Sequence, residues 1–148
     1  MKTKFRKIAT IALSLVLICT LAVSAFATVI FDSGEQTECG EVTFHTYVEG
    51  NADYAEARIV FDEVGPLTFD GKTILNYTYC VEDQVRPLYY QYGTKTQEFA
   101  RYSDVKYATY TVSSGYIMIE ATGKTQITQT INGVEYSTTT APVTITLD

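Results

Sequence analysis

The sequence has little of the side chains that most often carry out catalysis or hold metals. It contains no Trp, one His and three Cys among 148 residues. A lone His and the lack of a CxxC pair argue against zinc, whose structural sites need four Cys or His ligands. All 17 Asp and Glu but only 7 of the 11 Lys and Arg lie after residue 27, so that part has a formal charge of −10. This charge disfavours nucleic-acid binding and a polybasic membrane-surface role.

The first 27 residues are typical of a secretory signal peptide. A basic segment, residues 1–7, precedes an uncharged apolar run, residues 8–23, and Ala25 and Ala27 supply the small residues expected before a cleavage point. A retained membrane anchor is the alternative, but the run is short for a span of about 20 residues. We therefore expect a single exported, extracellular domain, residues 28–148, with no membrane span after removal of the signal.

Two cysteines remain in the predicted mature domain. Cys19 lies in the signal, where bulky Ile18 argues against the alternative of a lipid-modified cysteine, and Cys39 and Cys80 follow it. An even pair in an exported protein is usually oxidised. We therefore expect a disulfide, which would stabilise the domain by about 4 kcal/mol by closing about 40 residues. Two buried free thiols are the alternative.

Alternation of apolar and polar residues predicts an all-β domain of about nine short strands. Asp70-Gly71 and Asn132-Gly133 suit two-residue hairpin turns. Residues 96–103 are the only candidate for a helical turn. The strands are expected at residues 42–48, 55–61, 72–81, 88–92, 106–112, 116–121, 125–131, 134–140 and 143–147.

This pattern indicates an antiparallel β-sandwich, because alternation fits sheets that are buried on one face and wet on the other. A small closed β-barrel is the alternative. The Thr-rich hairpin of residues 125–140 is expected at an edge of a sheet, where another chain could pair with it.

Tyrosine is the one residue type in excess, with all 12 copies after residue 27. Tyr77 and Tyr79 share a face of one predicted strand, and Tyr90 and Tyr92 share a face of another. If these strands are neighbours, the four rings form a platform suited to a protein or a glycan. The alternative is aromatic pairing that only stabilises the sheet.

No group of residues predicts catalysis. His45 has no nucleophile beside it in a recognisable motif, and the serines lack a strained elbow. Paired carboxylates can hydrolyse glycans, but the adjacent acids stand at strand ends, where solvated turn charges are common. These acids are Asp62, Glu63, Glu82 and Asp83.

No cofactor or metal is expected from the motifs. The chain has no EF-hand loop, although a calcium site built from separate loops with Asp53, Glu56 or Asp62 stays open. The sequence thus favours a secreted, non-catalytic interaction module. Its alternatives are a bacteriocin-like or toxin-like effector, a small extracellular hydrolase using dispersed carboxylates, and a self-assembling structural protein.

Overall fold

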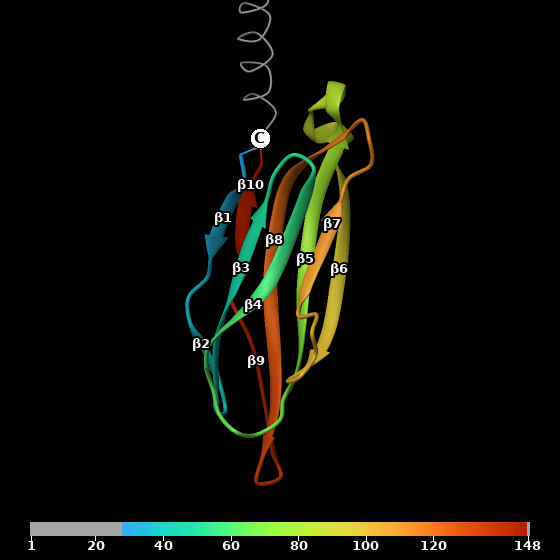
Figure 1. Cartoon of the computed structure of the whole chain (residues 1–148). Helices are drawn as coiled ribbons and strands as arrows, with labels where there is room; N and C mark the ends of the chain where they lie inside the picture. The colour runs from blue at the N-terminus through green and yellow to red at the C-terminus, as the bar shows by residue number, and fades with distance from the viewer. Residues whose placement is uncertain (1–27, 148) are drawn as a thin grey trace, which may run out of the picture.

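Residues 28–147 fold into two five-stranded antiparallel sheets (Figure 1). The computed structural model describes residues 28–147, and the predicted signal, residues 1–27, lies outside the described residues. In sheet A, β1 and β2 both pair with β3, which pairs with β4, which pairs with β7. The strands of sheet A are β1 (Ile30–Ser33), β2 (Thr37–Cys39), β3 (Val42–Gly50), β4 (Tyr54–Val64) and β7 (Tyr107–Thr111).

Sheet B has the order β6, β5, β8, and both β9 and β10 pair with the far side of β8. Its strands are β5 (Asp70–Val81), β6 (Gln91–Ala100), β8 (Tyr116–Ile131), β9 (Val134–Thr139) and β10 (Val143–Thr146). Two separate sheets form a sandwich, as predicted, and not the closed barrel that was the alternative.

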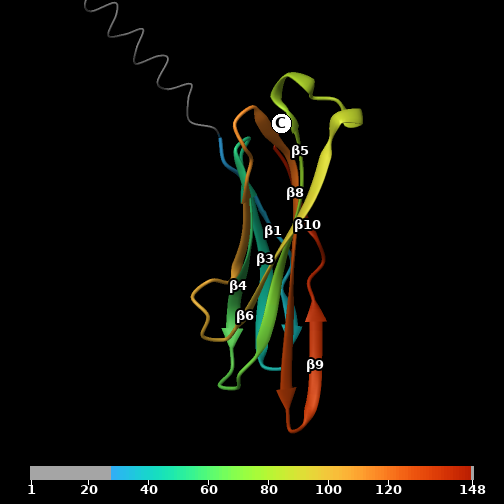
Figure 2. The ribbon, with the colours of Figure 1, turned by 90° about the vertical axis from the view of Figure 1, so that its right-hand side faces the viewer.

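The C-terminal hairpin follows the prediction closely. Asn132 and Gly133 have φ angles of 50° and 79°, the left-handed conformation that a type I′ turn requires. They join β8 to β9, which among the described strands pairs with β8 alone and is therefore an edge strand. Figure 2 shows β9 beside β8 at the lower end of the molecule.

The prediction of a turn at Asp70-Gly71 was wrong, because both residues begin β5. Gly71 lies directly opposite Phe99 of β6. A Cβ atom on Gly71 would stand 2.5 Å from the Phe99 ring. Here glycine makes room for an aromatic ring across the strands instead of turning the chain.

Three further segments differ from the prediction. Residues 116–121 and 125–131 form one 16-residue strand, β8, which pairs with β5 along nearly its whole length. Residues 88–90 of the predicted strand 88–92 are not in a strand, and β6 begins only at Gln91: two short 3₁₀ helices, η1 (Glu82–Gln84) and η2 (Pro87–Tyr89), project above the sheets before it (Figure 1). The predicted helical turn at residues 96–103 falls largely within β6, held in register by β5.

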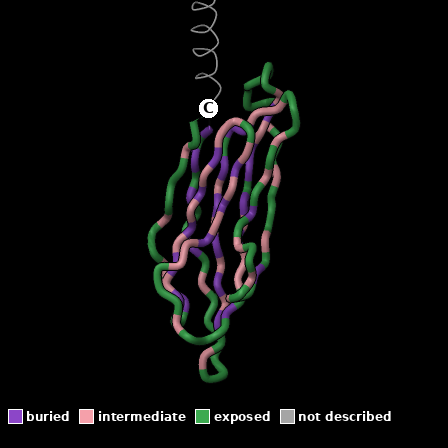
Figure 3. Tube along the Cα trace, in the orientation of Figure 1, coloured by how far each residue is buried: buried purple, intermediate pink, exposed green. Residues whose placement is uncertain are grey.

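The buried apolar residues form two clusters, one towards each end of the sandwich, and Figure 3 shows buried segments along the central strands. Both contain alternating inward residues of the two sheets, which is the pattern that the sequence predicted for β3 and β4. One cluster consists of Val48, Ala55, Ala57, Leu75, Tyr77, Ala108, Met118, Ala121, Val143, Ile145 and Leu147. The other consists of Cys39, Val42, Phe44, Ile59, Phe69, Phe99 and Ile127.

A layer of buried threonines separates the two clusters. Thr46 Oγ1 donates to Thr125 Oγ1 at 3.0 Å and lies 2.7 Å from Thr140 Oγ1. The Thr140 hydroxyl also accepts the backbone N–H of Thr125 at 3.1 Å, and Thr73 donates to the carbonyl of Lys106 at 2.9 Å. These bonds satisfy hydroxyls that would otherwise be buried without partners.

The sheets approach each other closely beside this layer, at Gly123. A Cβ atom there would lie 2.5 Å from Val48 Cγ2 and 2.7 Å from Ala57 Cβ, both in sheet A. A side chain at position 123 would therefore have to push the sheets apart. We name Gly123 and the four threonines (Thr46, Thr73, Thr125, Thr140) the waist of the sandwich.

The predicted disulfide does not form: Cys39 and Cys80 are free and buried. The Cys39 thiol lies 3.4 Å from the carbonyl of Ile127, whereas Cys80 pairs with Ile117. These two partners are ten positions apart on β8, roughly 33 Å at about 3.3 Å per residue. A disulfide needs Cα atoms within about 7 Å. Burial also raises the pKa of the Cys80 thiol, so it stays protonated and unreactive.

Replacing Thr46 by Val should lower the free energy of unfolding by about 1–2 kcal/mol, because the shape is kept but two buried hydrogen bonds are lost. Urea unfolding followed by tyrosine fluorescence measures this. The control is Thr144→Val, which removes an exposed hydroxyl pair with Thr122 and should change stability by less than about 0.5 kcal/mol. Equal effects of the two substitutions would contradict a special role for the waist.

Candidate binding surfaces

The four tyrosines of the predicted platform do not share a face. The strands β5 and β6 are neighbours, as the platform required, but Tyr77 lies opposite Gly93 and Tyr92 lies opposite Thr78. Tyr77 and Tyr79 therefore point between the sheets, while Tyr92 points outward and is 75% exposed. Tyr90 precedes β6 and caps η2.

A different set of four tyrosines meets between the sheets. Tyr77 of β5 stacks on Tyr110 of β7, with ring centroids 3.9 Å apart and planes 11° apart. Tyr79 lies 5.8 Å from Tyr110 and 5.7 Å from Tyr116 of β8. Burial raises the pKa of Tyr77 and of Tyr110. This cluster joins sheet A to sheet B. Tyr77 and Tyr79 thus take part in aromatic pairing within the fold, which was the alternative to a binding platform.

The outer face of sheet A carries a second aromatic group, whose rings pack against neighbouring side chains. The Tyr47 ring stacks on Phe31 at 5.9 Å and has the Arg58 guanidinium 4.7 Å from its centroid. Arg58 pairs with Glu49 at 2.6 Å and contacts Glu56 at 3.4 Å through Nε, a longer contact without hydrogen-bond geometry. This row holds β1, β3 and β4 together.

Arg58 separates two carboxylates that would otherwise repel each other. Glu49 and Glu56 lie directly opposite on β3 and β4, a pairing that destabilises a sheet when both are charged. Burial raises the pKa of Glu56, Arg58 lowers it and Glu49 raises it further. The raised pKa means that the folded protein takes up this proton before the unfolded chain does as the pH falls.

Replacing Arg58 by Ala should lower the free energy of unfolding by about 1–2 kcal/mol at neutral pH, through the lost ion pair, the lost cation–π contact and the exposed repulsion. The deficit should be smaller at about pH 5 than at about pH 7, because the raised pKa of Glu56 makes the folded state take up a proton increasingly as the pH falls, which weakens the repulsion. Denaturant unfolding at both pH values measures it. Arg86→Ala removes the same charge from an exposed loop position that has no ion pair among the described residues, and should change little. A deficit that is equal at both pH values would contradict this account.

The single imidazole has one side-chain partner within the described part of the chain. His45 Nδ1 lies 2.8 Å from Asp62 Oδ2 on the outer face of sheet A. Such a pair orients an imidazole, but acyl transfer also needs a nucleophile on the other ring nitrogen. The hydrogen bonds of residues 28–147 place no serine or cysteine there.

The adjacent acids lie at opposite ends of the sandwich. Asp62 and Glu63 end β4, which precedes β5, whereas Glu82 and Asp83 follow β5 in η1. The twelve residues of β5 span roughly 40 Å, far more than the roughly 10 Å at most that separates the two carboxylates of a glycosidase. The sequence left a calcium site built from separate loops open. Residues 28–147 contain no group of three or more His, Cys, Asp or Glu that could hold a metal ion. Asp53 directly precedes β4, whereas Asp62 lies near the other end of that strand.

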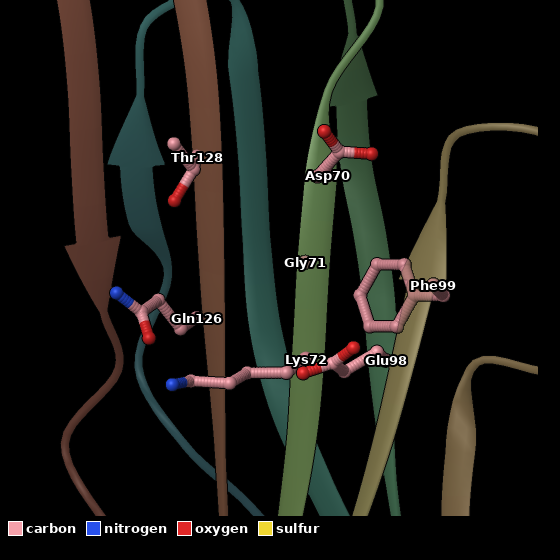
Figure 4. Close-up of a pocket in the computed structure, with 7 residues that line it drawn as sticks. All are labelled: Asp70, Gly71, Lys72, Glu98, Phe99, Gln126 and Thr128. Carbon is pink, nitrogen blue, oxygen red and sulfur yellow. The ribbon is translucent and has the colours of Figure 1, made fainter.

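A polar groove crosses the outer face of sheet B instead (Figure 4). It is a cavity of about 520 Å³ centred on Gly71. Figure 4 shows Asp70 and Thr128 on one side of Gly71 and the row of Gln126, Lys72 and Glu98 on the other. These side chains come from β5, β6 and β8, whose register places them in the two rows.

A second cavity of about 260 Å³ adjoins the first and shares Asp70 and Thr128 as a wall. It extends the groove past the ends of β5 and β6. Its polar lining includes Arg101, Tyr102 and Glu135. The Tyr102 ring is 79% exposed. The two cavities thus form one elongated, solvent-facing site.

Intramolecular contacts fix several side chains of this groove. Gln126 Nε2 donates to Ser137 Oγ of β9 at 2.8 Å, and the Thr128 hydroxyl lies 3.1 Å from the same oxygen. Arg101 donates to the carbonyls of Gly65 and Leu67 at 2.5 and 2.6 Å. A site whose side chains are already oriented loses less entropy when it binds a ligand.

Sequence reasoning missed these groove residues. The signal was present as polar residues at alternate positions in β5, β6 and β8, but only the register shows that they lie side by side. No known protein family, curated protein or solved structure matches the chain. Within residues 28–147, no helix is both long and apolar enough to cross a membrane.

Proposed function

We propose that the protein is an exported, non-catalytic interaction module and that its ligand, a protein or a glycan, lies in the groove of sheet B. The observation that carries the proposal is the pair of adjoining cavities that share Asp70 and Thr128 as a wall. A continuous site of this shape suits an extended ligand better than a compact one.

The polar groups of the groove and the strands that carry them support binding. Its side chains supply hydroxyl, amide, carboxylate and cationic groups on three adjacent strands, and rigid strands position such groups more accurately than loops do. The acids considered for hydrolysis, by contrast, are split between opposite ends of β5.

The N-terminal sequence supports action outside the cell. A basic start, an apolar run and Ala25 and Ala27 at the predicted cleavage point are the features of an export signal. Cys39 and Cys80 are free but compatible with the same location, because both thiols are buried and therefore shielded from oxidants.

Replacing Thr128 by Lys should abolish ligand capture, because a long charged side chain would fill the shared wall. The experiment probes a printed array of glycans and peptides with labelled protein purified after expression of the full chain. We expect the wild type to bind defined spots and Thr128→Lys to lose at least about tenfold in signal, equivalent to about 1.4 kcal/mol.

The matched control is Thr122→Lys. Thr122 lies on the same strand and the same face, outside both cavities, and its hydroxyl bonds to one partner, Thr144, as that of Thr128 bonds to Ser137. This variant should bind as the wild type does. No bound spot for the wild type, or equal binding by Thr128→Lys, would refute the proposal.

A further inference from the structure

The charges along the groove nearly cancel. The carboxylates of Asp70, Glu98 and Glu135 are interspersed with the cations of Lys72 and Arg101. The rest of residues 28–148 is strongly acidic, with a formal charge of −10 for the whole segment. An acidic ligand would be repelled by this field, and the groove offers no excess of cations to offset the repulsion.

The groove also lacks a deep apolar pocket. Its two phenylalanines, Phe69 and Phe99, are only 4% and 5% exposed because their rings pack inward. Tight protein partners rely on aromatic or aliphatic side chains that enter well-packed pockets. The polar lining of this groove offers no such pocket, which disfavours a peptide.

What the lining does offer is a mixture of hydrogen-bond donors and acceptors. Asp70 and Glu98 accept, Lys72 donates, and Gln126 and Thr128 can do both. Sugar hydroxyls likewise donate and accept. An uncharged polyhydroxylated chain can therefore satisfy these groups without bringing a charge into the acidic field.

An exposed aromatic ring stands in the second cavity. Tyr102 is 79% exposed, and the Arg101 guanidinium lies 5.4 Å from its ring centroid. A phenol ring gives a flat apolar surface with a polar tip, which matches the C–H face and the hydroxyl rim of a pyranose ring.

We propose that the groove binds an uncharged glycan chain that spans both cavities, with one sugar ring against Tyr102. This inference rests on the proposed function and narrows its ligand to one chemical class. The first cavity, around Gly71, holds one part of the chain, and the smaller cavity beyond Asp70 and Thr128 holds the next.

The test is isothermal titration calorimetry of the purified protein with defined oligomers. The neutral probes are cello-, xylo- and chito-oligosaccharides of two and of six sugars, and the charged probes are hexagalacturonate and hexalysine. At least one neutral hexamer should bind about tenfold more tightly than its dimer, because only the hexamer fills both cavities. Raising NaCl from about 0.05 M to about 0.5 M should change this affinity less than about twofold, because an uncharged ligand is not screened.

Two variants locate the ligand. Tyr102→Ala should weaken binding of the hexamer about tenfold, the value of one good stacking contact, and should leave the dimer unchanged within about twofold. Tyr92→Ala removes another exposed ring of sheet B that lies outside both cavities and should have no effect.

The outcomes separate the two proposals. Binding of hexagalacturonate or hexalysine that Thr128→Lys abolishes, with no binding of any neutral oligomer, would overturn the neutral-glycan inference and keep the groove as a binding site. Binding of a neutral hexamer that is unaffected by both Tyr102→Ala and Thr128→Lys would overturn both, as would the absence of binding by every probe.

Discussion

The structure depends on how closely its two sheets meet at the waist. Gly123 lets the backbone of β8 approach Val48 and Ala57, and beside it the Thr46 hydroxyl bonds to those of Thr125 and Thr140. Apolar residues fill the space on either side of this layer. The waist thus combines a close contact that tolerates no added side chain with buried polar groups that need hydrogen-bond partners, and both requirements constrain how the two sheets pack against each other.

The packing of the sheets decides which side chains face solvent. The inner face of β5 carries Tyr77 and Tyr79, which contact Tyr110 of sheet A. Because strand residues alternate between faces, Asp70 and Lys72 lie on the outer face of the same strand. Four of the twelve tyrosines thereby join the two sheets, and the groove on the outer side of sheet B is lined mainly by polar side chains. The surface that we propose for ligand binding is the outer face of the same strands whose inner faces stabilise the sandwich.

The sequence was informative wherever the answer depended on neighbouring residues. Alternation located β3, β4, β7, β9 and β10, and Asn132-Gly133 identified its hairpin. It failed where the answer depended on distant strands. Gly71 resembled a turn residue because the Phe99 ring that needs its space lies 28 positions away, and the short strands β1 and β2 exist through pairing with β3. The same limit explains the groove, the misplaced tyrosine platform and the disulfide: none of them can be derived without knowing which strands are neighbours.

The central claim is that the sheets meet face to face at Gly123 with the tyrosines between them. A NOESY spectrum of labelled protein tests it directly. The account predicts cross-peaks from the Gly123 α-protons to the methyl groups of Val48 and Ala57, together with ring-to-ring cross-peaks between Tyr77 and Tyr110, since these groups are in contact. Absence of both sets in a well-folded sample would show that the strands pair or pack in another way, and would contradict the account of the fold and of the surface it creates.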